Sequence, residues 1–178
     1  EYAQTRHNAG FWFVEQLAER YAIQLKADPK FHGFSGRGQI EGHDTRLLLP
    51  TTFMNRSGQS VVPFAKFYQI APEAMLIAHD ELDMNPGVIR LKSGGGHGGH
   101  NGLRDIVPHI GANFHRLRIG IGHPGAKEQV SGHVLGKAPS SEQALMDAAI
   151  DHALSKVKML VTGQVSQAMN QINAYKPT

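Results

Sequence analysis

The sequence has 178 residues and a formal net charge of +3, and 40% of its residues are hydrophobic while 19% are charged. This composition indicates a globular chain of one domain rather than a disordered one, and we predict a single domain over residues 1–178. The absence of cysteine excludes disulfides, thiolate metal sites and cysteine nucleophiles, and it suits a reducing compartment. No apolar run approaches the roughly 20 residues of a membrane-spanning helix, so no membrane partner is expected.

The first half of the chain predicts two helices and a hairpin. Asn8 can cap a helix that runs to about Tyr21, because apolar residues recur after it at helical spacing. Two β-rich runs within residues 31–49 flank a turn at 41–44 and predict a hairpin. A short loop then leads to a helix over about 57–68, which contains an interior proline.

The second half predicts three strands. Residues 75–78 are continuously apolar, which indicates a buried parallel strand that ends at His79 and Asp80. A second strand covers 88–92. Residues 114–121 alternate, so Leu117, Ile119 and Ile121 should face the core while Arg116 and Arg118 face outward.

Helices occupy most of the remaining second half. A glycine-rich loop precedes a helix over 101–109, and a serine at 140 or 141 should cap a long helix that ends near 161, before a short terminal helix. Strands that alternate with helices predict an α/β fold: one domain with a mixed, mostly parallel twisted sheet, flanked by helices in three layers.

The charge is concentrated in the middle of the chain. Residues 84–140 carry seven basic and two acidic side chains, a net charge of +5, and they contain the densest glycine cluster, at 94–102. Basic side chains beside exposed backbone N–H groups suit a polyanion such as nucleic acid. The alternative is an ordinary solvated face with a loop that needs positive φ angles.

Two residues are candidates for acid–base chemistry. Asp80 follows a buried strand, where a carboxylate can accept a hydrogen bond from an imidazole and fix its tautomer. His7 precedes the first helix, whose dipole disfavours an imidazolium and so favours a neutral base. Alternatively, Asp80 stabilises a turn in an acidic cluster that would suit a divalent cation, and His7 is an ordinary turn residue.

Asn55 and Asn101 both lie at junctions between a loop and a helix. An amide there can hold a water or a substrate carbonyl, because it donates and accepts without titrating. Helix capping is the alternative, since asparagine favours that position.

Other chemistries lack their usual patterns. The eleven histidines are dispersed, with no His-Glu-x-x-His run, so we predict no metal site and no cofactor. The sequence has no Gly-x-Ser-x-Gly motif, and the glycine cluster is not followed by the lysine of a Walker loop. Water activated by a histidine is the chemistry that remains.

Five segments together resemble the bacterial peptidyl-tRNA hydrolase family. They are EYAQTRHNAG (1–10), PTTFMNRSG (50–58), HDELD (79–83), GGGHGGHNG (94–102) and NFHRLRIGIGHPG (113–125). The resemblance implies a cytoplasmic, monomeric esterase that needs no metal. It would cleave the ester between a peptide and the 3′ end of tRNA, with the nascent peptide and the tRNA acceptor stem as its substrate.

The resemblance also implies roles for individual residues. His7 would activate water, Asp80 would orient His7, and Asn55 and Asn101 would hold the peptide and the water. Lys92 and Arg118 would clamp a tRNA phosphate, and residues 123–138 would form a gate. Further substrate contacts are implied at Tyr2, Phe53, Met54, Gly98, Gly99, His100 and Val134.

Members of the family normally open with a buried strand and a Gly-Leu-x-Asn-Pro-Gly turn before the Glu-Tyr motif, and both are absent from this sequence. We therefore expect a first strand, in the middle of the sheet, to precede Glu1 in the complete protein.

Two other functions remain open from the sequence. A non-catalytic RNA-binding module would explain the basic middle segment but would leave His7, Asp80 and the two asparagines without a role. A metallohydrolase that uses Asp80, Asp83 and histidines would lose activity in EDTA.

Overall fold

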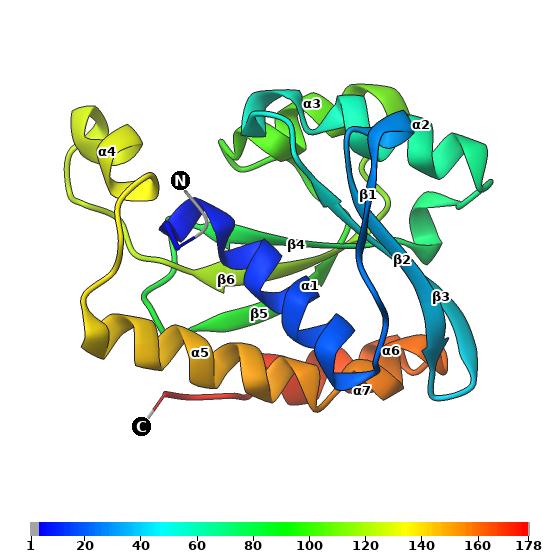
Figure 1. The fold of residues 1–178 in the computed structure, drawn as a ribbon. Helices are drawn as coiled ribbons and strands as arrows, with labels where there is room; N and C mark the ends of the chain where they lie inside the picture. Colours follow the sequence, from blue (N-terminus) through cyan, green and yellow to red (C-terminus); the bar gives the residue numbers. More distant parts are fainter. Residues whose placement is uncertain (1–3, 178) are drawn as a thin grey trace. The chain divides into compact units, whose positions relative to one another are not determined.

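The computed structural model describes residues 4–177. Its strands are β1 (Lys26–Asp28), β2 (Gly33–Ile40), β3 (His43–Pro50), β4 (Leu76–Glu81), β5 (Ile89–Ser93) and β6 (His115–Gly120). Its α-helices are α1 (Ala9–Arg20), α2 (Gly58–Phe67), α3 (Asn101–Ile110), α4 (Val130–Val134), α5 (Ser140–Leu154), α6 (Val157–Val161) and α7 (Val165–Asn173) (Figure 1). Short 3₁₀ turns include η1 (Arg6–Asn8), η3 (Met54–Arg56) and η5 (Lys127–Gln129).

The described residues form two compact units. Unit 1 contains residues 4–13, 78–92 and 117–177, and unit 2 contains 14–77 and 93–116. The expected single domain and its three layers therefore stay predictions.

The hairpin expected within 31–49 is confirmed. Strands β2 and β3 pair antiparallel from Gly33 opposite Pro50 to Ile40 opposite His43, and β1 adds a third antiparallel strand beside β2. Because Glu41 and Gly42 both have positive φ, at 50° and 78°, the turn has the twist that a tight hairpin needs.

The other sheet has the order β4-β6-β5 and is mixed, as predicted. The amides of His115 and Ile121 donate to the carbonyls of Met75 and Glu81, so β6 runs parallel to β4. The amides of Gly94 and Gly120 pair instead with Phe114 and Val88, so β5 runs antiparallel to β6. Among the described strands only β4 and β6 pair in parallel, which is less parallel pairing than expected. The reason is that the apolar pattern of residues 88–92 predicts a strand but not whether it runs parallel or antiparallel to its neighbour.

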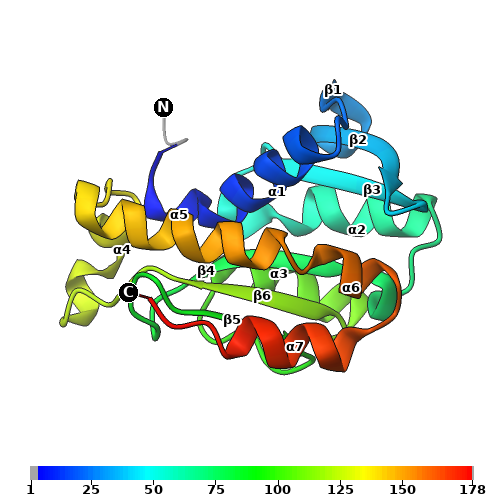
Figure 2. The same ribbon diagram turned by 90° about the horizontal axis from the view of Figure 1, so that it is seen from below.

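In unit 1, α5 supplies much of the buried core. The chain turns back after α6 (Figure 2), and the His152 imidazole donates to the Gln171 carbonyl at 3.0 Å while its ring stacks on Tyr175. Asn173 of α7 exchanges two side-chain hydrogen bonds with the backbone of Leu91, which pairs an otherwise open sheet edge. The buried side chains of α5 are Met146, Ala149, Ile150, Ala153 and Leu154.

In unit 2, α2 and α3 lie side by side (Figure 1). Leu103, Ile106 and Phe114 are at most 2% exposed and pack with half-buried residues from α2 and β4. A second apolar group is aromatic, because the Phe31 ring meets Phe64 edge-on at 5.3 Å. The α2–α3 pair is therefore a rigid base for the segments at its ends.

Two expectations about individual elements were wrong. Arg116 is buried rather than outward-facing, because a loop covers that face of β6. The helix expected to reach 161 ends at Leu154, where the Ser155 hydroxyl donates to the His152 carbonyl at 2.6 Å and satisfies a terminal acceptor. Asn8 is the last residue of η1 and lies directly before α1, so its expected capping role stays a prediction.

No helix within residues 4–177 combines the length and the apolar character that crossing a membrane requires.

Candidate active site

In unit 1, His7 and Asp80 form a direct pair. His7 lies in η1 and Asp80 near the carboxyl end of β4, and the imidazole Nδ1 donates to Asp80 Oδ2 at 2.7 Å. The side chains are 16% and 4% exposed, so the carboxylate is almost completely removed from water. A hydrogen bond at Nδ1 selects the tautomer of a neutral ring whose lone pair is at Nε2, the atom that could accept a proton.

Gly10 brings η1 close enough to β4 for this pair to form. A Cβ at Gly10 would lie 2.1 Å from the Ala78 carbonyl oxygen, so the first turn of α1 packs backbone against backbone on β4. No larger residue fits this contact without moving the helix. The glycine in the EYAQTRHNAG motif therefore sets the distance between the histidine and the carboxylate.

Arg6 joins the turn that carries His7 to the end of α4. Its side chain donates to the His133 carbonyl at 2.9 Å, and its amide donates to the Gly136 carbonyl at 3.1 Å. The His133 imidazole in turn donates to the Ile121 carbonyl at 3.1 Å, just past β6. Residues 123–138, expected to form a gate, thus contact η1 through His133 and Gly136 and the end of β6 through the His133 ring.

In unit 2, η3 and the start of α3 are brought together. A Cβ at Gly102 would lie 2.9 Å from Met54 Sδ, which shows how closely the two segments approach. The amide of Gly58 donates to Asp105 Oδ2 at 2.6 Å and anchors the start of α2 to α3. Asn55 on η3 and Asn101 at the start of α3 are consequently carried by neighbouring, mutually fixed segments.

Neither asparagine caps its helix. His100 does so for α3, because its Nδ1 accepts from the amides of Gly102 and Leu103 at 3.1 and 3.3 Å. Asn101 is exposed, and its Oδ1 accepts from Arg104 at 3.4 Å. Asn55 is also exposed, within η3. The capping interpretation therefore fails, and both amides are accessible to a ligand.

The cations expected to clamp a phosphate differ in their surroundings. Lys92 is exposed near the end of β5. Arg118 of β6 is 29% exposed and donates to Glu81 Oε1 from Nε at 3.0 Å and from Nη2 at 2.9 Å. Glu81 therefore neutralises part of the Arg118 charge, and a phosphate would have to compete with it.

The other predicted contact residues occupy both units. Phe53 of unit 2 is 79% exposed just before η3, an unusual position for a large aromatic side chain. Gly98 and Gly99 have positive φ in the loop before α3, and Val134 is half-buried at the end of α4 in unit 1. Tyr2 lies outside the described residues.

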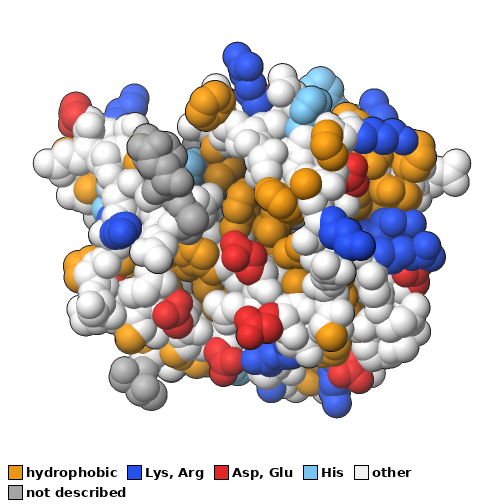
Figure 3. Space-filling model, viewed as in Figure 1, with side chains coloured by type: hydrophobic (Ala, Val, Ile, Leu, Met, Phe, Trp, Pro, Cys, Tyr) orange, Lys and Arg blue, Asp and Glu red, His pale blue; other side chains and the backbone are white. Residues whose placement is uncertain are grey.

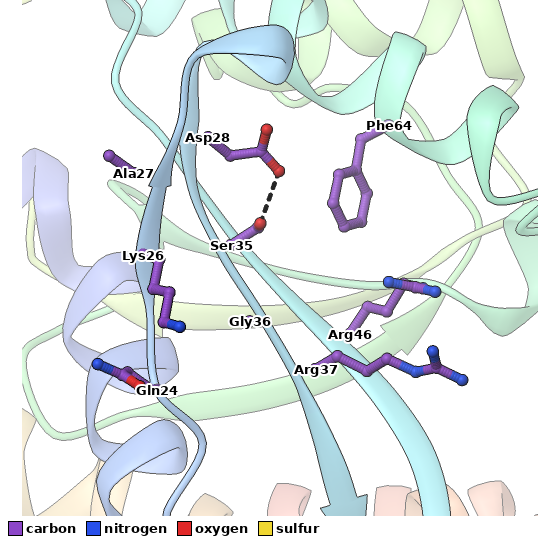
Figure 4. A pocket seen from close by; sticks show the side chains of 9 residues that line it. All are labelled: Gln24, Lys26, Ala27, Asp28, Ser35, Gly36, Arg37, Arg46 and Phe64. Atoms are coloured by element: carbon purple, nitrogen blue, oxygen red, sulfur yellow. Dashed lines mark hydrogen bonds between the residues drawn. The ribbon is translucent and has the colours of Figure 1, made fainter.

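A separate cavity of about 460 Å³ lies in unit 2 beside the three-stranded antiparallel sheet (Figure 4). Lys and Arg side chains gather on the face over β2 and β3 (Figure 3). Two hydrogen bonds from Arg37 hold the pKa of the Asp44 carboxyl below its usual value, and Arg46 lies 3.6 Å from the Tyr68 ring centroid. These cations already have partners within the chain. The cavity lining includes no predicted site residue; it consists of Gln24, Lys26, Ala27, Asp28, Ser35, Gly36, Arg37, Arg46 and Phe64.

Comparison with known proteins identifies the family. The sequence profile of the peptidyl-tRNA hydrolases matches residues 1–178. The chain belongs to the peptidyl-tRNA hydrolase family. It is 88% identical to the peptidyl-tRNA hydrolase of Acinetobacter baumannii strain AYE, over 99% of this chain and 92% of that one. Identity to the peptidyl-tRNA hydrolase of Psychrobacter cryohalolentis is 62%, over 99% of this chain and 91% of that one.

Solved peptidyl-tRNA hydrolases share the fold. A crystal structure of the enzyme from Acinetobacter baumannii matches with a TM-score of 0.99 and 87% identity, over 99% of this chain and 90% of that one. A complex of a peptidyl-tRNA hydrolase with N-propanol matches with the same TM-score, 86% identity and the same coverage. These matches confirm the α/β fold class and the family resemblance.

Sequence reasoning missed four residues that shape this peptidyl-tRNA hydrolase: Arg6, Gly10, Glu81 and Arg116. Gly10 carried a signal, since a glycine in the first turn of a helix costs stability unless a close contact requires it. Arg116 carried a weaker one, because a glycine-rich loop needs donors for its carbonyls. Arg6 contacts His133, which is 127 positions away in the sequence, and Glu81 contacts Arg118, which is 37 positions away. No local sequence pattern specifies contacts of this kind.

Proposed function

We propose that this member of the peptidyl-tRNA hydrolases cleaves the ester between a peptide and the 3′ end of tRNA with a water molecule activated by His7. Membership of the family makes the protein a hydrolase. The observation that carries the assignment of the base is the 2.7 Å hydrogen bond from His7 to the buried carboxylate of Asp80. A base fixed in one tautomer is what a water-based ester hydrolysis requires.

In the proposed reaction, His7 Nε2 takes a proton from water as the oxygen attacks the ester carbonyl carbon. The tetrahedral intermediate then collapses, and the bond to the 3′ oxygen of tRNA breaks. The imidazolium returns its proton to that oxygen, which leaves a free peptide carboxyl group and a tRNA hydroxyl. Asp80 remains ionised throughout and stabilises the imidazolium while it exists. The proposed mechanism needs no metal, because an aminoacyl ester is already activated.

We assign substrate contacts by resemblance to the family. Asn55 and Asn101 hold the peptide and the attacking water, supported by the exposure of both amides and by the failure of the capping interpretation. The exposed ring of Phe53 suits stacking on a terminal base. Further contacts are assigned to Tyr2, Met54, Gly98, Gly99, His100 and Val134.

The tRNA backbone is the second part of the proposed substrate. Lys92 and Arg118 contact a phosphate, and the exposure of Lys92 supports its part in this role. Since such contacts carry no sequence information, they suit an enzyme that acts on many tRNAs. We also propose that the protein works as a monomer in the cytoplasm, where its substrate is made.

The decisive experiment replaces the base. His7→Gln retains an amide that can donate to the buried Asp80 carboxylate, but it provides no basic nitrogen, so turnover of N-acyl-aminoacyl-tRNA should fall by about 10²–10⁴-fold. His7→Ala should lose as much activity and also some stability, because it removes one hydrogen-bond donor from the buried Asp80 carboxylate.

The assay compares initial rates in EDTA with the thermal melting curve of each variant. The parent protein should keep full activity in EDTA. Activity of His7→Gln within threefold of the parent would overturn the assignment of His7, and loss of parental activity in EDTA would favour a metal-dependent mechanism.

A further inference from the structure

Arg116 occupies an unusual position for a charged side chain. It lies in β6 and is only 2% exposed. Its guanidinium donates to the carbonyls of Gly95, Gly96 and Ala112, with distances of 2.5 Å to Gly95 and 3.1 Å to Ala112. Its Cζ also lies 4.4 Å from the Phe114 ring centroid. Since arginine stays protonated, a permanent charge is committed to backbone carbonyls inside unit 2.

In the sequence, these carbonyls come from residues both before and after α3. Gly95 and Gly96 belong to the loop before the helix, whereas Ala112 follows it. The chain between β5 and β6 thus leaves the sheet, forms the loop and α3, and returns to nearly the same place. Arg116 ties the outgoing and returning segments to each other.

Two further hydrogen bonds connect the segment that leaves β5 with the segment that returns to β6. The amide of Gly94 donates to the Phe114 carbonyl at 3.0 Å, and the Ser93 hydroxyl donates to His115 Nδ1 at 2.7 Å. Both links lie at the ends of β5 and β6. Arg116 is the link that reaches beyond the strand ends into the glycine loop itself.

Further along the loop, two hydrogen bonds are local: the Gly99 amide donates to His97 Nδ1 at 3.0 Å, and the His100 amide donates to the His97 carbonyl at 2.9 Å. Gly94, Gly95, Gly98 and Gly99 all have positive φ, and glycine loses more conformational entropy on ordering than any other residue. A Cβ at Gly98 or Gly99 would meet nothing within 4 Å, so the space beside each of these glycines is open. The loop therefore needs fixed points at its base, and Arg116 provides them.

We propose that Arg116 is a positioning residue, which fixes the glycine loop and so sets the positions of His100 and Asn101. This inference rests on the substrate contacts proposed above. His100 lies only four residues after Gly96, and its ring caps the N-terminus of α3. A shift at the base of the loop would consequently displace the cap and the amide together.

Lysine is the informative replacement. Its ammonium keeps the charge, but it is a point donor on a flexible stem and lacks the planar fork that meets carbonyls on two segments. Arg116→Lys should therefore preserve the fold while loosening the loop. The matched control is Arg37→Lys, an exposed arginine of the same unit outside the proposed site.

Hydrogen exchange and steady-state kinetics on peptidyl-tRNA test this proposal together. In Arg116→Lys, exchange of amides in residues 94–103 should accelerate by about tenfold or more, while amides of β2 and β3 keep their parental rates. The kcat should fall by about tenfold or more, with a smaller change in KM, because misplaced contacts weaken the transition state most. Arg37→Lys should match the parent in both measurements.

Several results would overturn the proposal. They are unchanged exchange in residues 94–103, faster exchange with parental kinetics, or acceleration spread evenly over unit 2, which would make Arg116 merely structural. An Arg116→Lys variant that fails to fold would likewise show that Arg116 has a general structural role and would overturn the proposal. Because exchange is measured without substrate, failure of the His7 assignment alone would leave the loop result standing.

Discussion

Buried polar side chains define this molecule at the scale of the residue. Asp80, Glu81 and Arg116 are each less than 9% exposed, and each meets a partner: His7, Arg118 and a set of carbonyls. Burying a charge is unfavourable unless it is paired, so these contacts constrain geometry as well as stability. The pair of His7 and Asp80 is the one with direct consequences for chemistry.

Asp80→Asn should separate catalysis from folding. The amide Nδ2 of asparagine can donate to His7 Nδ1, which places the ring proton at Nε2 and removes the proposed base. We expect kcat to fall by about 10²–10⁴-fold, while the melting temperature stays near the parental value because a buried charge has been removed.

The control is Asp83→Asn, since Asp83 is exposed and its backbone amide, which the substitution retains, donates to Glu81 Oε2. Rates within threefold of the parent for both variants would contradict the proposed role of Asp80.

At the scale of the element, the sequence predicted structures that depend on local rules. The β2–β3 hairpin followed from two β-rich runs that flank a turn, and α3 was expected directly after the glycine-rich loop. The outward orientation of Arg116 was wrong because alternation tells which residues share a face but not what covers it. The break after Leu154 was missed because Ser155 and Lys156 fit a helix, and the local contacts that form the turn, such as the bond from the Ser155 hydroxyl to the His152 carbonyl, are not visible in the residue pattern.

The site was predictable to a similar extent. Family motifs indicated His7, Asp80, Asn55 and Asn101, and the structure pairs the first two directly. The contact of Gly10 with Ala78 joins residues from separate elements, so it could not be derived from spacing. Long-range partners of this kind are set by packing, which a single sequence does not reveal.

Gly10→Ala tests how an element positions the base. The added Cβ would lie within 2.1 and 2.7 Å of the carbonyl oxygen and carbon of Ala78, backbone atoms that cannot rotate away. The start of α1 must therefore move off β4, which should cost about 1–3 kcal/mol of stability. We expect kcat to fall by about tenfold or more, since His7 moves with the helix.

Denaturant unfolding and kinetics measure these two effects. Glu15→Ala, on the exposed side of α1, serves as the control and should leave both values unchanged. Parental activity and stability in Gly10→Ala would show that the helix tolerates the shift.

At the scale of the whole molecule, formal charge gives an incomplete account of the proposed tRNA-binding residues. Residues 84–140 carry seven basic side chains, but Arg116 is buried and Arg118 shares its charge with Glu81. Lys92, in contrast, is exposed. Because electrostatic affinity for a nucleic acid depends on accessible cations, Lys92 should contribute more to the salt dependence of binding than Arg118 does.

Lys92→Ala should weaken tRNA binding and lower the slope of log K against log salt by about 0.7–0.9, the change expected for one lost phosphate contact. Hydrolysis of a small N-acyl-aminoacyl ester should stay at the parental rate, since that substrate has no phosphate backbone.

The matched control for net charge is Lys158→Ala, which replaces an exposed lysine of α6 and should keep the parental slope. Binding titrations at several salt concentrations give the slopes. An equal change in both variants would mean that net charge rather than a phosphate contact at Lys92 governs binding, and equal loss on both substrates would place Lys92 in the chemistry instead.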